Sequence, residues 1–234
     1  MDAVRGAKFT KLAREIIVAA RDGGGNPDTN LRLRFAMQQA RDNSMPADKI
    51  KNAILRGTGE LEGGVFDEIT YEGYAQGGVA VLVQCATDNR NRTVADIRTI
   101  FNKRGGRMGE SGSVAYLFNS PQGLITISRD VTDEDTLLGM ALEAGAEDVK
   151  TLEDAYEVYT SPGDLPQILD ALQKAGIKAL SHEITMVPTN TVTIHGKEAS
   201  QVLQLIEQLE ENDDVQAVFS NFDIPDDELE SVLG

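Results

Sequence analysis

Apolar residues recur at helical spacing through the first quarter of the chain. Over residues 7–21 the apolar positions fall on one side of a helix and the basic positions fall on the other. The apolar side holds Phe9, Leu12, Ile16 and Ala20, and the basic side holds Lys8, Lys11, Arg14 and Arg21. A further helix is predicted over residues 30–43. Another is predicted over residues 46–56, because Pro46 suits a first turn and Gly57 can end a helix. Three short helices predict a small bundle.

The pattern changes after the glycine-rich segment 57–64, which we take as a domain boundary. Apolar β-branched runs predict strands over residues 66–74, 79–86 and 114–118. A helix is predicted over residues 94–103, because Thr93 and Asp96 have the spacing of a capping box and Gly105 can end the helix. Strands with one covering helix are typical of an α+β domain.

From residue 123 the predicted elements follow a regular order, βαββαβ, which is that of a ferredoxin-like unit. The elements are a strand at 124–129, a helix at 132–144, strands at 148–152 and 155–160, a helix at 162–175 and a strand at 178–187. The tail adds strands at 191–194 and 215–219, a helix at 198–211 and a short acidic final helix. Such a tail is too small to fold alone, so we expect it to complete the sheet begun at residue 66.

These elements predict an α+β multidomain fold. A three-helix basic bundle occupies residues 1–60, and residues 61–122 with 189–234 form a discontinuous α+β middle domain. The acidic ferredoxin-like unit, residues 123–188, is then an insertion in that middle domain.

Charge is distributed very unevenly over the 234 residues, whose net charge is −16. Residues 1–60 hold 11 Lys and Arg against 7 Asp and Glu, whereas residues 130–234 hold 4 against 24. We therefore expect only the front of the chain to meet an anionic polymer, while the acidic end favours solubility or faces a basic protein partner. The sequence has neither an apolar run long enough for a membrane span nor a signal-peptide pattern, so a cytoplasmic protein is expected.

The strongest candidate chemistry is phosphate binding. The loop 87–92 precedes a predicted helix, whose N-terminus favours anions, and it carries Asn89, Arg90 and Arg92. Further candidate cations follow that helix at Lys103, Arg104 and Arg107, and those of the bundle are Lys8, Lys11, Arg14, Arg21, Arg32, Arg34 and Arg41. The alternatives are that these cations are merely solvated, or that residues 88–92 form a structural loop that orients the domains.

Catalytic and cofactor sites have little support in the sequence. His182 and His195 are the only histidines and neither has a ligand at metal-binding spacing, while Cys85 is the only cysteine and lies in a predicted strand. Nucleophile-elbow, P-loop, kinase and dinucleotide-binding signatures are absent. We therefore predict a non-enzymatic protein without metal or cofactor.

Several distinctive stretches together cover nearly the whole chain: YEGYAQGGVAVLVQCATDNRNRTVADIRTIFNKRGGRMGESGSVAYLF, FTKLAREI, GGGNPDTNLRLR, RGTGELEG, ALEAGAEDV, EITMVPTNTV and DDVQAVFSNFDI. They resemble the YebC/PmpR family of transcriptional regulators, which is also similar to mitochondrial translational activators of cytochrome oxidase synthesis. The resemblance implies three domains and a role on promoter DNA or on the translating ribosome. It places the family motif at Asp88, Asn89, Arg90, Asn91 and Arg92, and the bundle cations at Lys8, Lys11 and Arg14.

Family members usually begin with a lysine-rich arm containing GHSKW, which this sequence lacks, in agreement with its having no tryptophan. Two alternatives stay open: the true start lies upstream of this sequence, or the arm is missing. If it is missing, we expect weaker binding with a shallower salt dependence than in full-length relatives. The leading hypothesis is a DNA-binding transcriptional regulator. A ribosome-associated translation factor is the alternative, and a protein-interaction scaffold that uses the acidic face is a weaker one.

Overall fold

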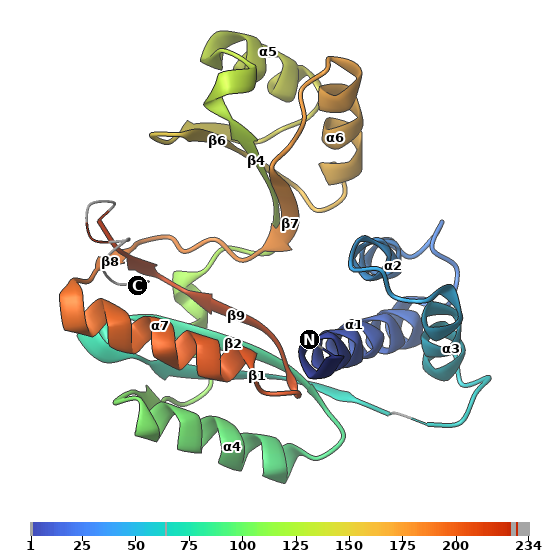
Figure 1. The fold of residues 1–234 in the computed structure, drawn as a ribbon, viewed down its shortest axis with the longest axis vertical. Coiled ribbons are helices and arrows are strands. Elements are labelled where there is room, and N and C mark those ends of the chain that lie inside the picture. The colour runs from blue at the N-terminus through green and yellow to red at the C-terminus, as the bar shows by residue number, and fades with distance from the viewer. Residues whose placement is uncertain (1, 64, 226–227, 229–234) are drawn as a thin grey trace. The chain divides into compact units, whose positions relative to one another are not determined.

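The protein folds into two compact units, seen in a computed structural model that describes residues 2–63, 65–225 and 228 (Figure 1). One unit combines Met1–Leu117 with Asn190–Gly234, and the other is Phe118–Thr189. The first unit holds both the helical front and the first sheet. The division of the chain into three domains therefore stays a prediction.

Three helices form the front of the first unit: α1 (Asp2–Gly23), α2 (Leu31–Asp42) and α3 (Ala47–Gly57). Asn30 begins α2, because its side chain accepts a hydrogen bond from the Leu33 amide at 3.0 Å and donates to the Ala19 carbonyl at 2.7 Å. The buried core of this bundle includes Ile16, Ile17, Leu33, Ala36, Ile50 and Ala53. The three predicted helices are confirmed, and the first begins several residues earlier than its apolar pattern indicates.

The first unit also contains a four-stranded antiparallel sheet in the order β3-β1-β2-β9. Its strands are β1 (Asp67–Tyr74), β2 (Ala80–Thr87), β3 (Arg107–Met108) and β9 (Val215–Ser220). Two helices, α4 (Arg90–Lys103) and α7 (Gly196–Glu210), share one core with the sheet through Val81, Val83, Ile97, Phe101, Val202 and Leu205. The tail therefore does complete the sheet, as predicted, by supplying β9.

Two predictions for this region are wrong: the start of α4, and the strand over residues 114–118. Helix α4 begins at Arg90 rather than residue 94, because Asn89 is its N-cap and accepts a hydrogen bond from the Arg92 amide at 3.1 Å. The Thr93 hydroxyl is buried and contacts Asp214 instead of capping the helix. The C-cap prediction holds, since Gly105 follows the helix with a φ of 73° that suits glycine.

The strand predicted over residues 114–118 is instead a short 3-10 helix, Ala115–Leu117. The buried carboxylate of Glu72 accepts hydrogen bonds from the backbone amides of Gly112, Val114 and Ala115 at 2.6–2.8 Å. Those amides are therefore held by a side chain and are not available for a strand ladder. The third strand forms earlier in the chain, at β3.

Residues 191–194 supply only β8 (Val192–Thr193), which pairs in parallel with β10 (Phe222–Asp223) outside the main sheet. The short acidic final helix predicted for the tail lies outside the described residues. Among the helices that are described, none combines the length and apolar character needed to cross a membrane.

The second unit contains the predicted βαββαβ order. Its elements are β4 (Gln122–Ser128), α5 (Glu134–Glu143), β5 (Asp148–Thr151), β6 (Ala155–Thr160), α6 (Leu165–Lys174) and β7 (Ser181–Thr185). The strands pair antiparallel in the order β5-β6-β4-β7. Alternate residues of the central strands are buried, among them Ile125, Ile127 and Val158, as are Leu137 and Ile168 of the two helices.

Candidate nucleic-acid interface

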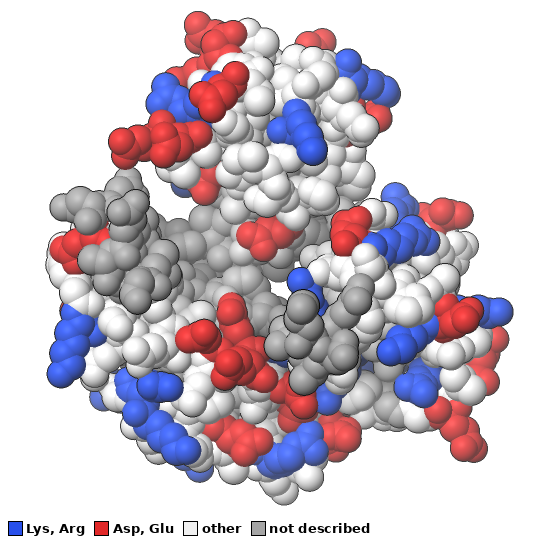
Figure 2. Space-filling view, in the orientation of Figure 1, with Lys and Arg blue, Asp and Glu red and all other residues white. Residues whose placement is uncertain are grey.

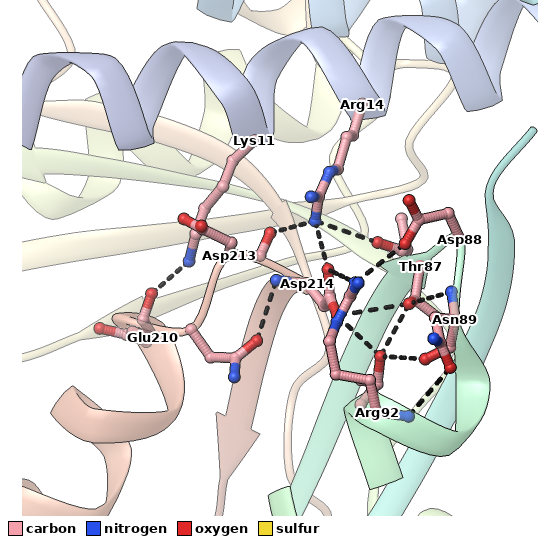
Figure 3. Close-up of polar contacts among 12 residues, drawn as sticks. Lys11, Arg14, Thr87, Asp88, Asn89, Arg92, Glu210, Asp213 and Asp214 are labelled. Carbon is pink, nitrogen blue, oxygen red and sulfur yellow. Dashed lines mark hydrogen bonds and ion pairs between the residues drawn. The ribbon is translucent and has the colours of Figure 1, made fainter. Parts of the chain in front are cut away.

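Asp214 lies far from the predicted arginine loop in the sequence, but its side chain contacts that loop in the folded protein. It stands between α7 and β9, and only 4% of its side chain is exposed. Its carboxylate accepts hydrogen bonds from Arg14 of α1 at 2.8 Å and from Arg92 of α4 at 2.8 and 3.0 Å (Figure 3). The Thr93 hydroxyl donates a further bond at 2.7 Å. One buried carboxylate thus joins two helices from different parts of the fold.

The loop itself is held by a chain of polar contacts. The Asn89 amide donates to the Thr87 hydroxyl at 2.9 Å, and that hydroxyl lies 2.7 Å from the Thr93 hydroxyl. Arg92 also donates to Asp88 at 2.9 Å, so its guanidinium group contacts two carboxylates. A buried charge is tolerated only when it is paired and hydrogen-bonded, and Asp214 meets that requirement.

The ionisation of this cluster agrees with its geometry. Burial by itself raises the pKa of Asp214, but hydrogen bonds from Arg92 and Thr93 and the charge of Arg14 outweigh burial and leave the pKa below its usual value. The bonds to Asp214 and Asp88 raise the pKa of Arg92. Both groups are therefore charged at neutral pH, and their main interactions are with each other.

Three further contacts run from α1, two of them to backbone carbonyls at or just after the C-terminal end of α7 and one to β2. The Lys11 amine donates to the Glu210 carbonyl, and the Arg14 guanidinium donates to the Asp213 carbonyl and, at 3.3 Å, to the Ala86 carbonyl (Figure 3). Cations favour the end of a helix where carbonyl groups lack partners. Burial lowers the pKa of Lys11, although the carboxylates of Glu210 and Asp213 act in the opposite direction. Lys11 and Arg14 thus attach the bundle to the sheet.

The ring of Phe66 adds a cation–π contact to this attachment, because the Arg14 guanidinium lies 5.1 Å from the centroid of that ring. Phe66 immediately precedes β1 and also packs against the bundle core. We call the set Lys11, Arg14, Arg92 and Asp214 the charged joint. It fixes α1 against β2, α4 and α7.

The remaining cations of the loop and of the helix exit are more accessible. Arg90 pairs with Asp67 at 2.8 Å, but 64% of its side chain is exposed. After α4, Arg104 donates to Gln204 and Gln208 of α7 at 2.9 Å each, whereas Arg107 lies over the Tyr74 ring at 5.5 Å. Lys103 is exposed and makes no ion pair with a described residue.

The candidate cations of the bundle that lie outside the charged joint divide into two groups. Arg21 and Arg32 belong to an ion-pair network with Glu15, Asp22 and Glu68, in which Arg32 lies 2.7 Å from Glu15 and 2.6 Å from Glu68. Lys8 and Arg41 are exposed and make no ion pair within the described part of the chain. Arg34 donates to the carbonyls of Pro27 and Asp28 at 3.0 Å each, and no described carboxylate forms an ion pair with it.

Helix α3 adds three exposed cations that the sequence analysis did not include: Lys49, Lys51 and Arg56. They could have been found from the same helical spacing, because the buried Ile50 and Ala53 define the inner face of α3 and leave these positions outside. Basic and acidic side chains are interspersed over the bundle in Figure 2. The face of the bundle that this view shows therefore offers separate cations rather than one deep basic cleft.

Redox and metal chemistry have no evident site in the described residues. Cys85 is buried in β2, and burial raises the pKa of its thiol to about 12, so the reactive thiolate is disfavoured. No group of three or more His, Cys, Asp or Glu side chains among the described residues is arranged to hold a metal ion.

Comparison with known proteins gives a consistent assignment. Residues 1–60 match the family described as the TACO1/YebC protein N-terminal domain, and residues 66–222 match the TACO1/YebC second and third domain. The chain belongs to the TACO1/YebC family.

TACO1/YebC relatives match over nearly the full chain. A protein of Dictyoglomus turgidum is 50% identical over 99% of this chain and 93% of its own length, and one of Acidithiobacillus ferrooxidans is 54% identical over 97% and 90%. Both are named "Probable transcriptional regulatory protein". The crystal structure of a conserved hypothetical protein from Aquifex aeolicus is similar, with a TM-score of 0.82, 48% identity, and coverage of 97% of this chain and 94% of that one.

Proposed function

We propose that this protein is a non-enzymatic regulator of gene expression that binds nucleic acid through the exposed cations of its helical bundle. The observation that carries the proposal is that four bundle cations are exposed and make no ion pair with any described residue, in contrast to the paired arginines of the charged joint. They are Lys8, Arg41, Lys51 and Arg56. Such cations can replace the counterions of a phosphate backbone, which makes binding favourable and dependent on salt. The names of the relatives support regulation of transcription as the process.

The charged joint has a different role in this proposal. Arg14 and Arg92 are bound to Asp214, so a phosphate would have to displace a carboxylate that is already buried and hydrogen-bonded. Arg90, Lys103 and Arg107 are exposed and are able to make secondary phosphate contacts. Because these exposed cations are separate, binding is expected to involve phosphates more than base edges.

A salt titration of matched variants tests the proposal. Lys8→Glu with Arg56→Glu removes two exposed bundle cations, and Lys178→Glu with Lys197→Glu makes the same change in net charge elsewhere. Fluorescence anisotropy with duplex DNA should show a weaker affinity and a salt slope reduced by about 2 for the first pair only. Equal losses in both pairs, or no binding by the intact protein at low salt, would contradict the proposal.

Two further measurements distinguish DNA from the ribosome as the target. Structured RNA replaces duplex DNA in the anisotropy assay, and the position of the protein is followed in cell extracts separated on sucrose gradients. A DNA-binding regulator should stay at the top of the gradient, whereas a ribosome-associated translation factor should move with the ribosomal fractions.

We also propose a basic protein partner for the acidic second unit. That unit, Phe118–Thr189, contains 13 Asp and Glu but only 4 Lys and Arg. Acidic surfaces of this kind steer basic partners by long-range attraction. We likewise propose that the chain has three domains, with the ferredoxin-like unit inserted in the middle one.

A further inference from the structure

The helical bundle contains an apolar groove between α2 and α3. Its volume is about 260 Å³, and its lining includes Met37, Met45, Ile50 and Ile54 together with the cations Arg41 and Lys51. The groove stays open because α2 and α3 each pack mainly against α1 and contact each other little. The bundle thus leaves part of its apolar surface accessible on the side away from α1.

The lining of the groove suits a protein side chain better than a nucleic acid. Methionine side chains adapt to different apolar shapes, and a hydrophobic groove between helices is a common site for the apolar face of another helix. A phosphate backbone would gain nothing from Met37, Met45 and Ile54 and would contact only the cations at the rim.

The charge of the rim specifies the partner further. Arg41 and Lys51 are both exposed, and neither makes an ion pair with a described residue. Asp42 and Asp48 lie nearby in the sequence but do not line the groove. An occupant that carries carboxylates beside its apolar face would therefore pair with both cations, whereas a basic occupant would be repelled.

We propose that the α2–α3 groove binds an acidic amphipathic helix of another protein. The apolar face of that helix contacts the methionine and isoleucine side chains, and its flanking carboxylates pair with Arg41 and Lys51. The proposal does not depend on nucleic-acid binding, but Arg41 and Lys51 are also among the cations that we propose for phosphate contact, so the acidic helix and a nucleic acid would compete for them.

Synthetic peptides and charge reversal test this proposal. The probe is a labelled helical peptide of about 16 residues with leucine on one face and glutamate beside it, and its counterpart has lysine in place of each glutamate. We expect the glutamate peptide to bind the intact protein, and Arg41→Glu with Lys51→Glu to weaken it roughly tenfold or more while allowing the lysine peptide to bind. Lys178→Glu with Lys197→Glu is the matched control and should bind as the unaltered protein does.

A second measurement reports on the groove directly. With methyl-labelled methionine, the glutamate peptide should shift the NMR signals of Met37 and Met45, which lie in the groove. The proposal is overturned if the glutamate peptide does not bind, if charge reversal leaves its affinity unchanged, or if those methyl signals do not move. It is also overturned if duplex DNA, but not the peptide, shifts them, or if sedimentation shows that a second copy of this chain fills the groove.

Discussion

The cations of the charged joint and those on the outside of the bundle differ in what they contact, although α1 contributes to both groups. Arg14 is 13% exposed and is bound to Asp214, whereas Lys8, two turns earlier, is exposed and makes no ion pair with a described residue. The loop that most resembles a phosphate site is therefore largely occupied by the protein's own carboxylates. A cluster of arginines near a helix N-terminus can hold a fold together as well as bind a ligand.

The joint also explains why Arg92 can lie in the first turn of α4, where a positive charge is unfavourable. Asp214 and Asp88 supply the negative charge that this end of a helix attracts, and Arg92 pairs with both of them. On the outside of the bundle no such compensation is present for Lys8, Arg41 or Lys51 within the described residues. The comparison predicts that changes in the joint affect stability and that changes outside it affect binding.

Removal of the joint's carboxylate should have the largest effect. Asp214→Ala leaves Arg14 partly buried without its ion-pair partner and also removes one acceptor each from Arg92 and Thr93. We expect the free energy of unfolding to fall by about 3–5 kcal/mol, measured by urea denaturation. Asp213→Ala is the matched control, because Arg14 contacts the backbone carbonyl of Asp213 and not its side chain. An equal loss in both variants would show that the ion pair does not stabilise the joint.

A second buried carboxylate sharpens the comparison, because Glu72 is held by backbone amides and not by cations. Glu72→Ala leaves the amides of Gly112, Val114 and Ala115 without their acceptor, and we expect a loss of about 1–3 kcal/mol. Amide hydrogen exchange should become faster at those three residues while α1 stays protected. The exposed Glu110, changed to Ala, is the control and should alter neither property.

The stability contributed by the charged joint should fall as the pH falls, because the pKa of Asp214 is lowered in the folded protein. Because that pKa is lower in the folded protein than in the unfolded chain, the ionised carboxylate contributes stability above the unfolded pKa. The contribution is lost as the pH falls through the folded pKa, and Glu72 behaves in the same way because its pKa is also lowered. Asp214→Asn should therefore show a shallower loss of stability than the unaltered protein between about pH 5 and pH 2. Parallel curves for the two proteins would contradict this assignment.

Much of the fold follows from local signals in the sequence, whereas the joint does not. Pro46 and Gly57 mark the ends of α3, Asn30 and Asn43 flank α2, and alternating apolar residues give the βαββαβ order of the second unit. The start of α4 is misplaced in the sequence prediction because Asn89 and Thr93 are both suitable caps. In the folded protein the Thr93 hydroxyl instead contacts Thr87, Asn89 and the distant Asp214. Asp214 is separated from Arg14 by 200 residues. No periodicity or short motif reports such a pairing.

The smallest effect on stability, and the sharpest test of the comparison, is expected at Arg90. It belongs to the arginine loop, but its one ion pair with a described residue is that with Asp67 on the surface, where ion pairs contribute little. Arg90→Ala should therefore leave the urea midpoint unchanged.

If the bundle is the principal phosphate-binding surface, Arg90→Ala should also change the salt slope for duplex DNA less than Lys8→Ala does. A larger change at Arg90 would place the loop at the interface after all, because Arg90 is the arginine of this loop that Asp214 does not bind. The charged joint would then both support the fold and present a neighbouring cation to the nucleic acid.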